Sequence, residues 1–273
     1  MRILLHPGFH KTGTSSLQRG AEARMDVLAP HLRLMVTADV IEAARAARKF
    51  SAQPDMTLLR SFAERLAEAV EPLDPSDPRA LLISAEDLSG YIPGHHGVAG
   101  YDAAPPLMNV ATAVLRSHFG PDAEVTIWYT TRTARDWQRS VYWQNLRALR
   151  LTQEFEEYRV TLTHAARLGD VVRAVADRLG PRARVTHTPI ENCGATPLGP
   201  LGAALDLLGI PTDDIAPLPA HNVQPDGAAE ELLALNRSDL DDTALADAKR
   251  EVIRAHRRLG YTHRAPRSDG PGA

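Results

Sequence analysis

Near its start the chain reads Leu4-Leu5-His6-Pro7-Gly8-Phe9-His10-Lys11-Thr12-Gly13-Thr14-Ser15-Ser16-Leu17-Gln18. A short apolar run ends at a Pro-Gly pair. One lysine, a second glycine and three hydroxyl residues then precede a segment that is compatible with a helix. A strand, a glycine loop with a lysine and a helix start build a binding site for an anion, because the loop amides and the helix N-terminus point at one spot. This order predicts a phosphate-like ligand at the loop.

The residue types in the loop suit such a ligand. Glycine lets the backbone approach a phosphate, Lys11 adds a full positive charge, and the hydroxyls of residues 14–16 can cap the helix or donate to oxygens. The pattern is not Walker A, which has four residues between its first glycine and a Gly-Lys-Ser/Thr triplet. Here two residues separate Gly8 from Lys11. A glycine-rich turn without a ligand is the alternative reading.

A second strand-to-helix junction lies in the middle of the chain. Residues 124–131 are rich in β-branched and aromatic side chains and predict a buried strand. Arg132 follows directly, and Thr133 can cap a helix through residues 135–144. The further arginines of this helix are typical of a solvated face, whereas Arg132 and Ser140 are candidates to bind a ligand.

Strands and helices alternate along the chain and predict an α/β fold. Strands are expected at residues 3–5, 32–36, 80–84, 124–131 and 184–188. Helices are expected at about residues 14–28, 41–50, 58–70, 107–119, 135–144, 155–168, 171–179, 198–208, 228–235 and 244–259. The expected architecture is a P-loop-like three-layer fold with a central, mostly parallel sheet flanked by helices and a helical C-terminal part. One domain is expected over residues 1–263, with residues 264–273 as a disordered tail.

A carboxylate lies at the predicted ligand-binding edge of this sheet. In parallel α/β sheets, ligands bind beyond the carboxyl ends of the strands. Ser84 and Glu86 emerge where the strand at residues 80–84 ends, on the same side as the Lys11 loop and Arg132. Glu86 is therefore a candidate general base. The alternative is a short helix capped by Ser84 or Asp87, with Glu86 in its first turn.

These segments resemble the sulfotransferases that use 3′-phosphoadenosine 5′-phosphosulfate (PAPS). In that family, a loop similar to residues 10–16 holds the 5′-phosphosulfate, and an arginine with a serine eight positions later holds the 3′-phosphate. The resemblance implies donor contacts from His10, Lys11, Thr12, Gly13, Thr14, Ser15, Ser16, Arg132 and Ser140. A guanidinium offers phosphate a bidentate fork, and a helical hydroxyl adds a directional donor.

The resemblance also implies a reaction. A sulfuryl group would move from PAPS to a hydroxyl or amine of an acceptor, with release of 3′,5′-ADP and no metal. Lys11 would neutralise charge on the bridging oxygen. Glu86 resembles the glutamate base of bacterial and heparan-type members; because cytosolic members use a histidine, His10, His95 and His96 remain rivals. A P-loop kinase that needs magnesium and a non-catalytic nucleotide-binding relic are the alternatives.

The chain departs from the family in places. The cytosolic enzymes carry an Arg-Lys-Gly loop that is absent here. Leu17 stands where they carry a tryptophan that stacks on adenine. The adenine pocket therefore stays open, with Trp137 and Trp143 as candidates that are equally suited to the core. The loop at residues 221–225 resembles an asparagine-containing loop of bacterial members.

Composition indicates which partners the protein can bind and where in the cell it is expected. The formal net charge of −3 provides no surface for nucleic acid, which favours a small alcohol, lipid or sugar as the acceptor. Cys193 is the only cysteine, so no intrachain disulfide forms, and it suits a small filler better than a nucleophile. No targeting segment precedes the first strand and no apolar run approaches a membrane span, so a cytoplasmic protein is expected. Lys49 and Lys249 are expected on helix surfaces, and the oligomeric state is left open.

Overall fold

The computed structural model describes residues 1–193, 196–217 and 227–262, with side chains described up to residue 256. The chain divides into two compact units, one of Met1–Val141 with Thr161–Pro219 and one of Tyr142–Val160 with Ala220–Ala273. The expected single domain over residues 1–263 stays a prediction. The expected tail at residues 264–273 and the loop at residues 221–225 lie outside the described residues.

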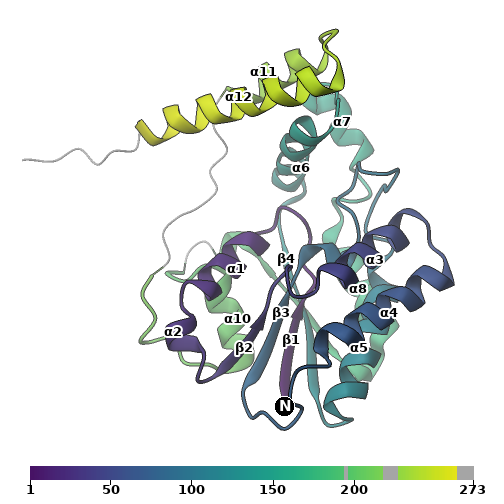
Figure 1. Ribbon diagram of the computed structural model, residues 1–273, viewed down its shortest axis with the longest axis vertical. Helices are drawn as coiled ribbons and strands as arrows, with labels where there is room; N and C mark the ends of the chain where they lie inside the picture. Colours follow the sequence, from purple (N-terminus) through teal and green to yellow (C-terminus); the bar gives the residue numbers. More distant parts are fainter. Residues whose placement is uncertain (194–195, 218–226, 263–273) are drawn as a thin grey trace, which may run out of the picture. The chain divides into compact units, whose positions relative to one another are not determined.

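The first unit is built on a five-stranded sheet in which every strand pair is parallel (Figure 1). Its strands, in spatial order, are β2 (Leu32–Met35), β3 (Ala80–Ser84), β1 (Arg2–His6), β4 (Glu124–Thr131) and β5 (Arg184–Pro189). β1 is central, and His6 pairs with Ser84 of β3 at its carboxyl end. The ends of β1, β3 and β4 therefore meet at one edge, as the sequence predicted.

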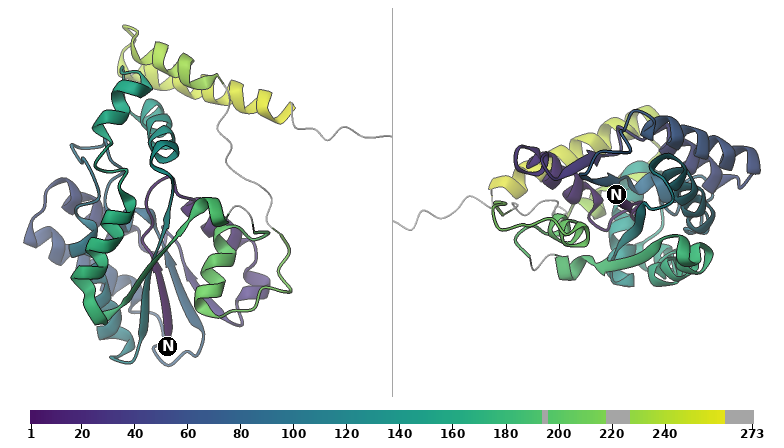
Figure 2. Two further views of the ribbon diagram at one scale, coloured as in Figure 1. Left: turned by 180° about the vertical axis from the view of Figure 1, so that it is seen from behind. Right: turned by 90° about the horizontal axis from the view of Figure 1, so that it is seen from below.

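Helices cover both faces of this sheet (Figures 1 and 2). One face carries α1 (Thr14–Glu22), α2 (Met25–Leu28) and α10 (Pro200–Leu208). The other carries α3 (Ile41–Ala52), α4 (Met56–Val70), α5 (Ala104–Phe119) and α8 (Leu168–Leu179). Because both faces are covered, the central strands are almost continuously apolar and buried, as in Leu4-Leu5 and Leu81-Leu82-Ile83. The predicted three-layer α/β fold is confirmed.

Further helical elements complete the described chain. They are η1 (Glu86–Ser89), α6 (Ala134–Ala148), α7 (Phe155–Thr161), η2 (Gly180–Arg182), α9 (Ile190–Cys193), α11 (Ala228–Asn236) and α12 (Asp242–Thr262). The predicted helical C-terminal part is present. In the described part of the chain, no helix has the length and apolar character that crossing a membrane requires.

Two predicted helices are interrupted. The helix expected at residues 14–28 ends at Glu22, and Arg24 leaves the helical region while its guanidinium donates to the carbonyls of Ala216 and Pro217. The break lets Leu28 join the same core as Leu17. The apolar period continues through the interruption, so the sequence pattern did not reveal it.

The helix expected at residues 155–168 ends at Thr161, and turns connect it to α8. Leu162, Ala165 and Ala166 stay buried although they are not helical, so burial alone produced the apolar pattern that predicted a helix.

The second unit contains a buried lysine that the sequence predicted to be exposed. Lys249 is only 6% exposed, and its ammonium donates to the carbonyls of Leu146 (2.9 Å) and Leu149 (2.7 Å) at the C-terminus of α6. The amide of Asn236 donates to the same Leu146 carbonyl and to that of Leu151. Helix ends leave carbonyls without partners and carry partial negative charge, so a buried cation is stabilised here.

Candidate functional site

The loop between β1 and α1 requires both of its glycines. Gly8 has φ +53°, and a Cβ there would lie 2.7 Å from Thr14 Oγ1. Gly13 has φ +101°, and a Cβ there would lie 2.6 Å from Ile190 Cδ1. Lys11 also adopts a left-handed conformation, with φ 68°. The loop is thus a strained turn that packs tightly against its surroundings.

The start of α1 presents polar groups that the protein itself does not use. Gly13 is the N-cap residue and no side chain caps the helix, so the hydroxyls of residues 14–16 are not caps. The Gly13 carbonyl accepts from the amides of Ser16 and Leu17. Among the described residues, the amides of Thr14 and Ser15 donate to no protein acceptor, and the buried Thr14 hydroxyl has no hydrogen-bond partner. These donors suit an anion at the helix N-terminus.

A chain of buried polar groups lies beneath the loop. His6 Nδ1 lies 3.0 Å from Ser84 Oγ and its Nε2 lies 3.2 Å from Thr130 Oγ1. Thr130 Oγ1 lies 2.9 Å from Thr12 Oγ1, and Thr12 donates to the Phe9 carbonyl at 2.7 Å. The chain links β3, β1 and β4 to the loop.

The direction of these hydrogen bonds follows from the last one. Because Thr12 donates to a carbonyl, its oxygen accepts from Thr130, which in turn accepts from His6 Nε2–H. His6 is neutral, since complete burial lowers its pKa to about 3, so its Nδ1 accepts from Ser84. Each hydrogen bond from Ser84 to the Phe9 carbonyl therefore has one donor and one acceptor. The Thr12 hydroxyl is consequently bound to the protein, and only the backbone of Thr12 can serve a ligand.

The structure brings Arg132 to the loop. Arg132 follows β4, and its Nη1 lies 3.5 Å from the carbonyl oxygen of Lys11. Thr133, ahead of α6, donates its hydroxyl to Asp136 and its amide to Glu191. Ser140 lies half-buried within α6, and no contact between its hydroxyl and Arg132 is present in the described residues.

Glu86 begins η1 at the end of β3, directly against the loop. A Cβ on Gly8 would lie 3.5 Å from the Glu86 Cα. The short helix of the alternative interpretation is present with Glu86 in its first turn, but Ala85 is its N-cap and neither Ser84 nor Asp87 caps it with a side chain. Glu86 Oε2 is buried and has no hydrogen-bond partner. An unpartnered buried carboxylate oxygen is costly, which makes it a candidate functional group.

His10 is held at both ring nitrogens. Nδ1 lies 3.2 Å from the Tyr101 hydroxyl, and Nε2 lies 3.0 Å from Asp87 Oδ1. As a result neither nitrogen is open to a substrate. Sequence reasoning missed Asp87, Tyr101 and Arg48 as parts of this site, because the pairing joins segments up to 91 residues apart.

Other candidates lie elsewhere or play structural parts. His95 and His96 lie on the turn-rich loop after η1, where His96 packs on Tyr91 with ring centroids 4.4 Å apart. Trp137 is fully buried, and its Nε1 donates to the His10 carbonyl at 2.9 Å. Cys193 is buried at the end of α9, and burial followed by the charge of Glu191 raises the pKa of its thiol, which suits a filler.

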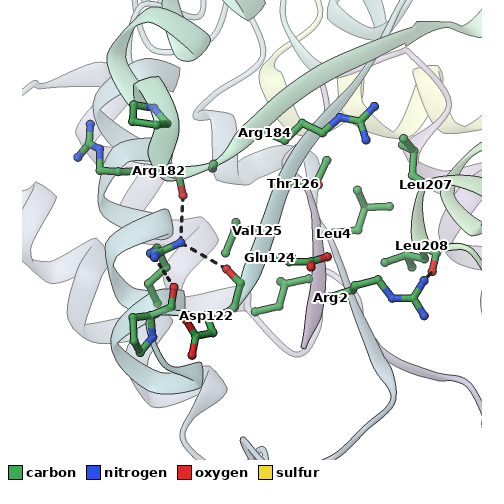
Figure 3. Close-up of a pocket in the computed structure, with 16 residues that line it drawn as sticks. Arg2, Leu4, Asp122, Glu124, Val125, Thr126, Arg182, Arg184, Leu207 and Leu208 are labelled. Carbon is green, nitrogen blue, oxygen red and sulfur yellow. Dashed lines mark hydrogen bonds between the residues drawn. The ribbon is translucent and has the colours of Figure 1, made fainter.

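A cavity of about 440 Å³ opens at the opposite end of the sheet, at the amino ends of β1, β4 and β5 (Figure 3). None of the predicted site residues lines it. Three of its four arginines donate to backbone carbonyls: Arg2 to Leu208, Arg116 to Pro121, and Arg182 to Leu179. Two of these carbonyls end α10 and α8 and the third lies in the turn after α5, so those three arginines already bind the protein's own backbone.

The chain was compared with protein-family models, curated proteins and solved structures. No protein-family model matches the sequence, and no curated protein matches it. Among solved structures, the chain is similar to a sulfotransferase from Alicyclobacillus acidocaldarius, with 17% sequence identity and a TM-score of 0.44. The similarity covers 93% of this chain and 98% of that chain.

Proposed function

We propose that the protein is a PAPS-dependent sulfotransferase that moves a sulfuryl group to a hydroxyl or amine of a small-molecule acceptor and releases 3′,5′-ADP. One observation carries the proposal. At the carboxyl edge of the sheet, the glycine loop that carries Lys11 has Arg132 close to the Lys11 carbonyl and the Glu86 backbone close to Gly8.

The donor nucleotide would bind by its phosphates. The amides of Thr14 and Ser15, the unpartnered Thr14 hydroxyl and the Lys11 ammonium suit the 5′-phosphosulfate. Arg132 suits the 3′-phosphate because its guanidinium is planar and bidentate. Ser140 is proposed as the second 3′-phosphate contact, and the backbones of His10, Thr12, Gly13 and Ser16 shape the loop.

The proposed reaction is an in-line displacement at sulfur. A bond forms between sulfur and the acceptor oxygen or nitrogen while the bond from sulfur to the bridging oxygen of the 5′-phosphate breaks. The acceptor proton passes to Glu86, a step for which a poised base typically contributes about 10²–10⁴-fold. Lys11 and the loop amides stabilise the charge that grows on the departing phosphate. The acceptor is proposed to be an alcohol, lipid or sugar in the cytoplasm.

A thermal-shift titration tests this proposal against a kinase. A ligand at 100 times its dissociation constant stabilises the folded state by about 2.7 kcal/mol. We expect 3′,5′-ADP to raise the melting temperature without magnesium. Stabilisation by Mg-ATP alone would point to a kinase. No response to either nucleotide would contradict both enzymes.

A further inference from the structure

His10, the residue before Lys11, makes four polar contacts with the surrounding protein. The His10 amide donates to the Tyr101 hydroxyl at 3.0 Å, and its carbonyl accepts from Trp137 Nε1 at 2.9 Å. Its ring contacts Tyr101 on one side and Asp87 on the other. The His10 and Asp87 side chains are only 12% and 18% exposed. The four contacts fix both the backbone and the ring of His10.

Asp87 links this residue to two further elements. One carboxylate oxygen contacts His10 and the other accepts from Arg48 of α3. Burial alone would raise the pKa of Asp87, but the hydrogen bonds and charges of His10 and Arg48 outweigh burial and lower it. Asp87 therefore stays ionised and joins the loop, η1 and α3.

The positions of the two partners along the chain are informative. His10 directly precedes Lys11, and Asp87 directly follows Glu86. We propose that the His10–Asp87 pair is a positioning device that fixes Lys11 relative to Glu86. The inference rests on the proposed function for the roles of Lys11 and Glu86. The pairing itself is independent of that function.

Lys11 needs such support. A left-handed conformation at a residue other than glycine is sparsely populated and persists only where the surrounding structure holds it. Tyr101, which binds His10, is itself packed against two rings. Its ring centroid lies 4.8 Å from that of Phe9 and 6.3 Å from that of Trp137. The carbonyl of Lys11 also faces Arg132. Loss of the pair should therefore loosen the loop and η1 together.

Hydrogen exchange tests the device without a ligand. Asp87→Asn removes the charge that His10 and Arg48 share. We expect the amides of residues 9–13 and 86–89 to exchange about tenfold faster together, while the strands stay protected. Arg45→Gln is the control, since Arg45 is exposed on the same helix as Arg48. Unchanged exchange in both segments, or faster exchange in only one, would overturn the proposal.

Nucleotide binding tests whether the pair acts through Lys11. We expect Asp87→Asn to weaken 3′,5′-ADP by roughly three- to tenfold in the wild-type background and by less than about twofold in the Lys11→Ala background. Equal weakening in both backgrounds would mean that Asp87 does not position Lys11. If Asp87→Asn fails to fold, Arg48→Gln takes its place with the same expected pattern. A wild-type protein that binds no 3′,5′-ADP contradicts the proposed function, and hydrogen exchange then decides the pairing alone.

Discussion

His6 shows how one buried residue organises the site. The sequence patterns did not single it out, yet it connects Ser84 and Thr130 beneath the loop. Its neutral state means that Nδ1 accepts from Ser84 while Nε2–H donates to Thr130. Protonation would place a hydrogen on Nδ1 opposite the Ser84 hydroxyl and disturb that order.

The pH dependence of stability should report His6. Its pKa falls from 6.5 to about 3 on folding, so the unfolded chain binds the proton first and stability is lost as pH decreases below about 6.5. At pH 5 the loss from this group is about 2 kcal/mol. Urea unfolding at pH 7.5 and pH 5 should show this loss in the wild type and not in His6→Asn, which keeps an acceptor toward Ser84. An identical pH dependence in both proteins would refute the neutral-histidine account.

Substitutions of Lys11 and Glu86 should have different effects on turnover and on 3′,5′-ADP affinity. Under the proposed function, Lys11→Ala removes a cation that would contact the donor both before and during the reaction, so turnover and 3′,5′-ADP affinity should both fall. Glu86→Gln keeps size and polarity but accepts no proton. It should leave 3′,5′-ADP affinity nearly intact while turnover falls by about 10²-fold or more. Radiolabelled sulfate transfer and calorimetry measure the two quantities. Near-normal turnover in Glu86→Gln would remove it as the base.

At the scale of elements, the tight start of α1 depends on Gly13. A side chain there meets both an unfavourable φ of +101° and Ile190. Gly227 offers a matched control, because it is also a left-handed helix N-cap with φ +75°, and an added Cβ would meet only His256 Cε1 at an ordinary 3.5 Å. Gly227→Ala should cost about 1–2 kcal/mol from the backbone alone. Gly13→Ala should cost about 1–3 kcal/mol more, because the clash forces a shift.

Thermal or urea unfolding of both glycine variants measures the difference. Gly13→Ala in an Ile190→Ala background should recover part of the extra cost. Equal destabilisation at the two glycines would show that packing against α9 does not constrain the loop.

The sequence predicted most elements for physical reasons. Continuous apolar or β-branched runs mark buried strands and a period of about 3.6 residues marks helices, and the strands that the sequence predicted are the strands observed. The sequence did not predict the helix ends at Glu22 and Thr161, because buried apolar residues continue through both interruptions. In the site, Lys11, Glu86 and Arg132 could be placed at one edge because parallel strands end there. The contacts of His10 with Asp87 and Tyr101 depend on loop conformations that no local pattern encodes.

At the scale of the whole molecule, the second unit depends on a buried cation. Burial, followed by the like charge of Arg150, lowers the pKa of Lys249. Lys249→Met keeps much of the volume but leaves the Leu146 and Leu149 carbonyls without this donor. We expect a loss of about 1–3 kcal/mol in the free energy of unfolding. Lys49→Met, at an exposed position of α3, should stay within about 0.5 kcal/mol of the wild type in the same urea titration. Equal effects would show that the capping contacts contribute nothing.

The central claim is that the loop and Arg132 together recognise a nucleotide with phosphates at both the 3′ and 5′ positions. Calorimetric titration of 3′,5′-ADP and 5′-AMP into the wild type, Arg132→Ala and the exposed control Arg135→Ala tests it most directly. A charge-assisted hydrogen bond contributes about 1.5–3 kcal/mol, so Arg132→Ala should weaken 3′,5′-ADP by roughly tenfold or more and leave 5′-AMP nearly unchanged. Arg135→Ala should bind both nucleotides as the wild type does. Equal weakening of the two nucleotides by Arg132→Ala, or no wild-type preference for 3′,5′-ADP, would contradict the account.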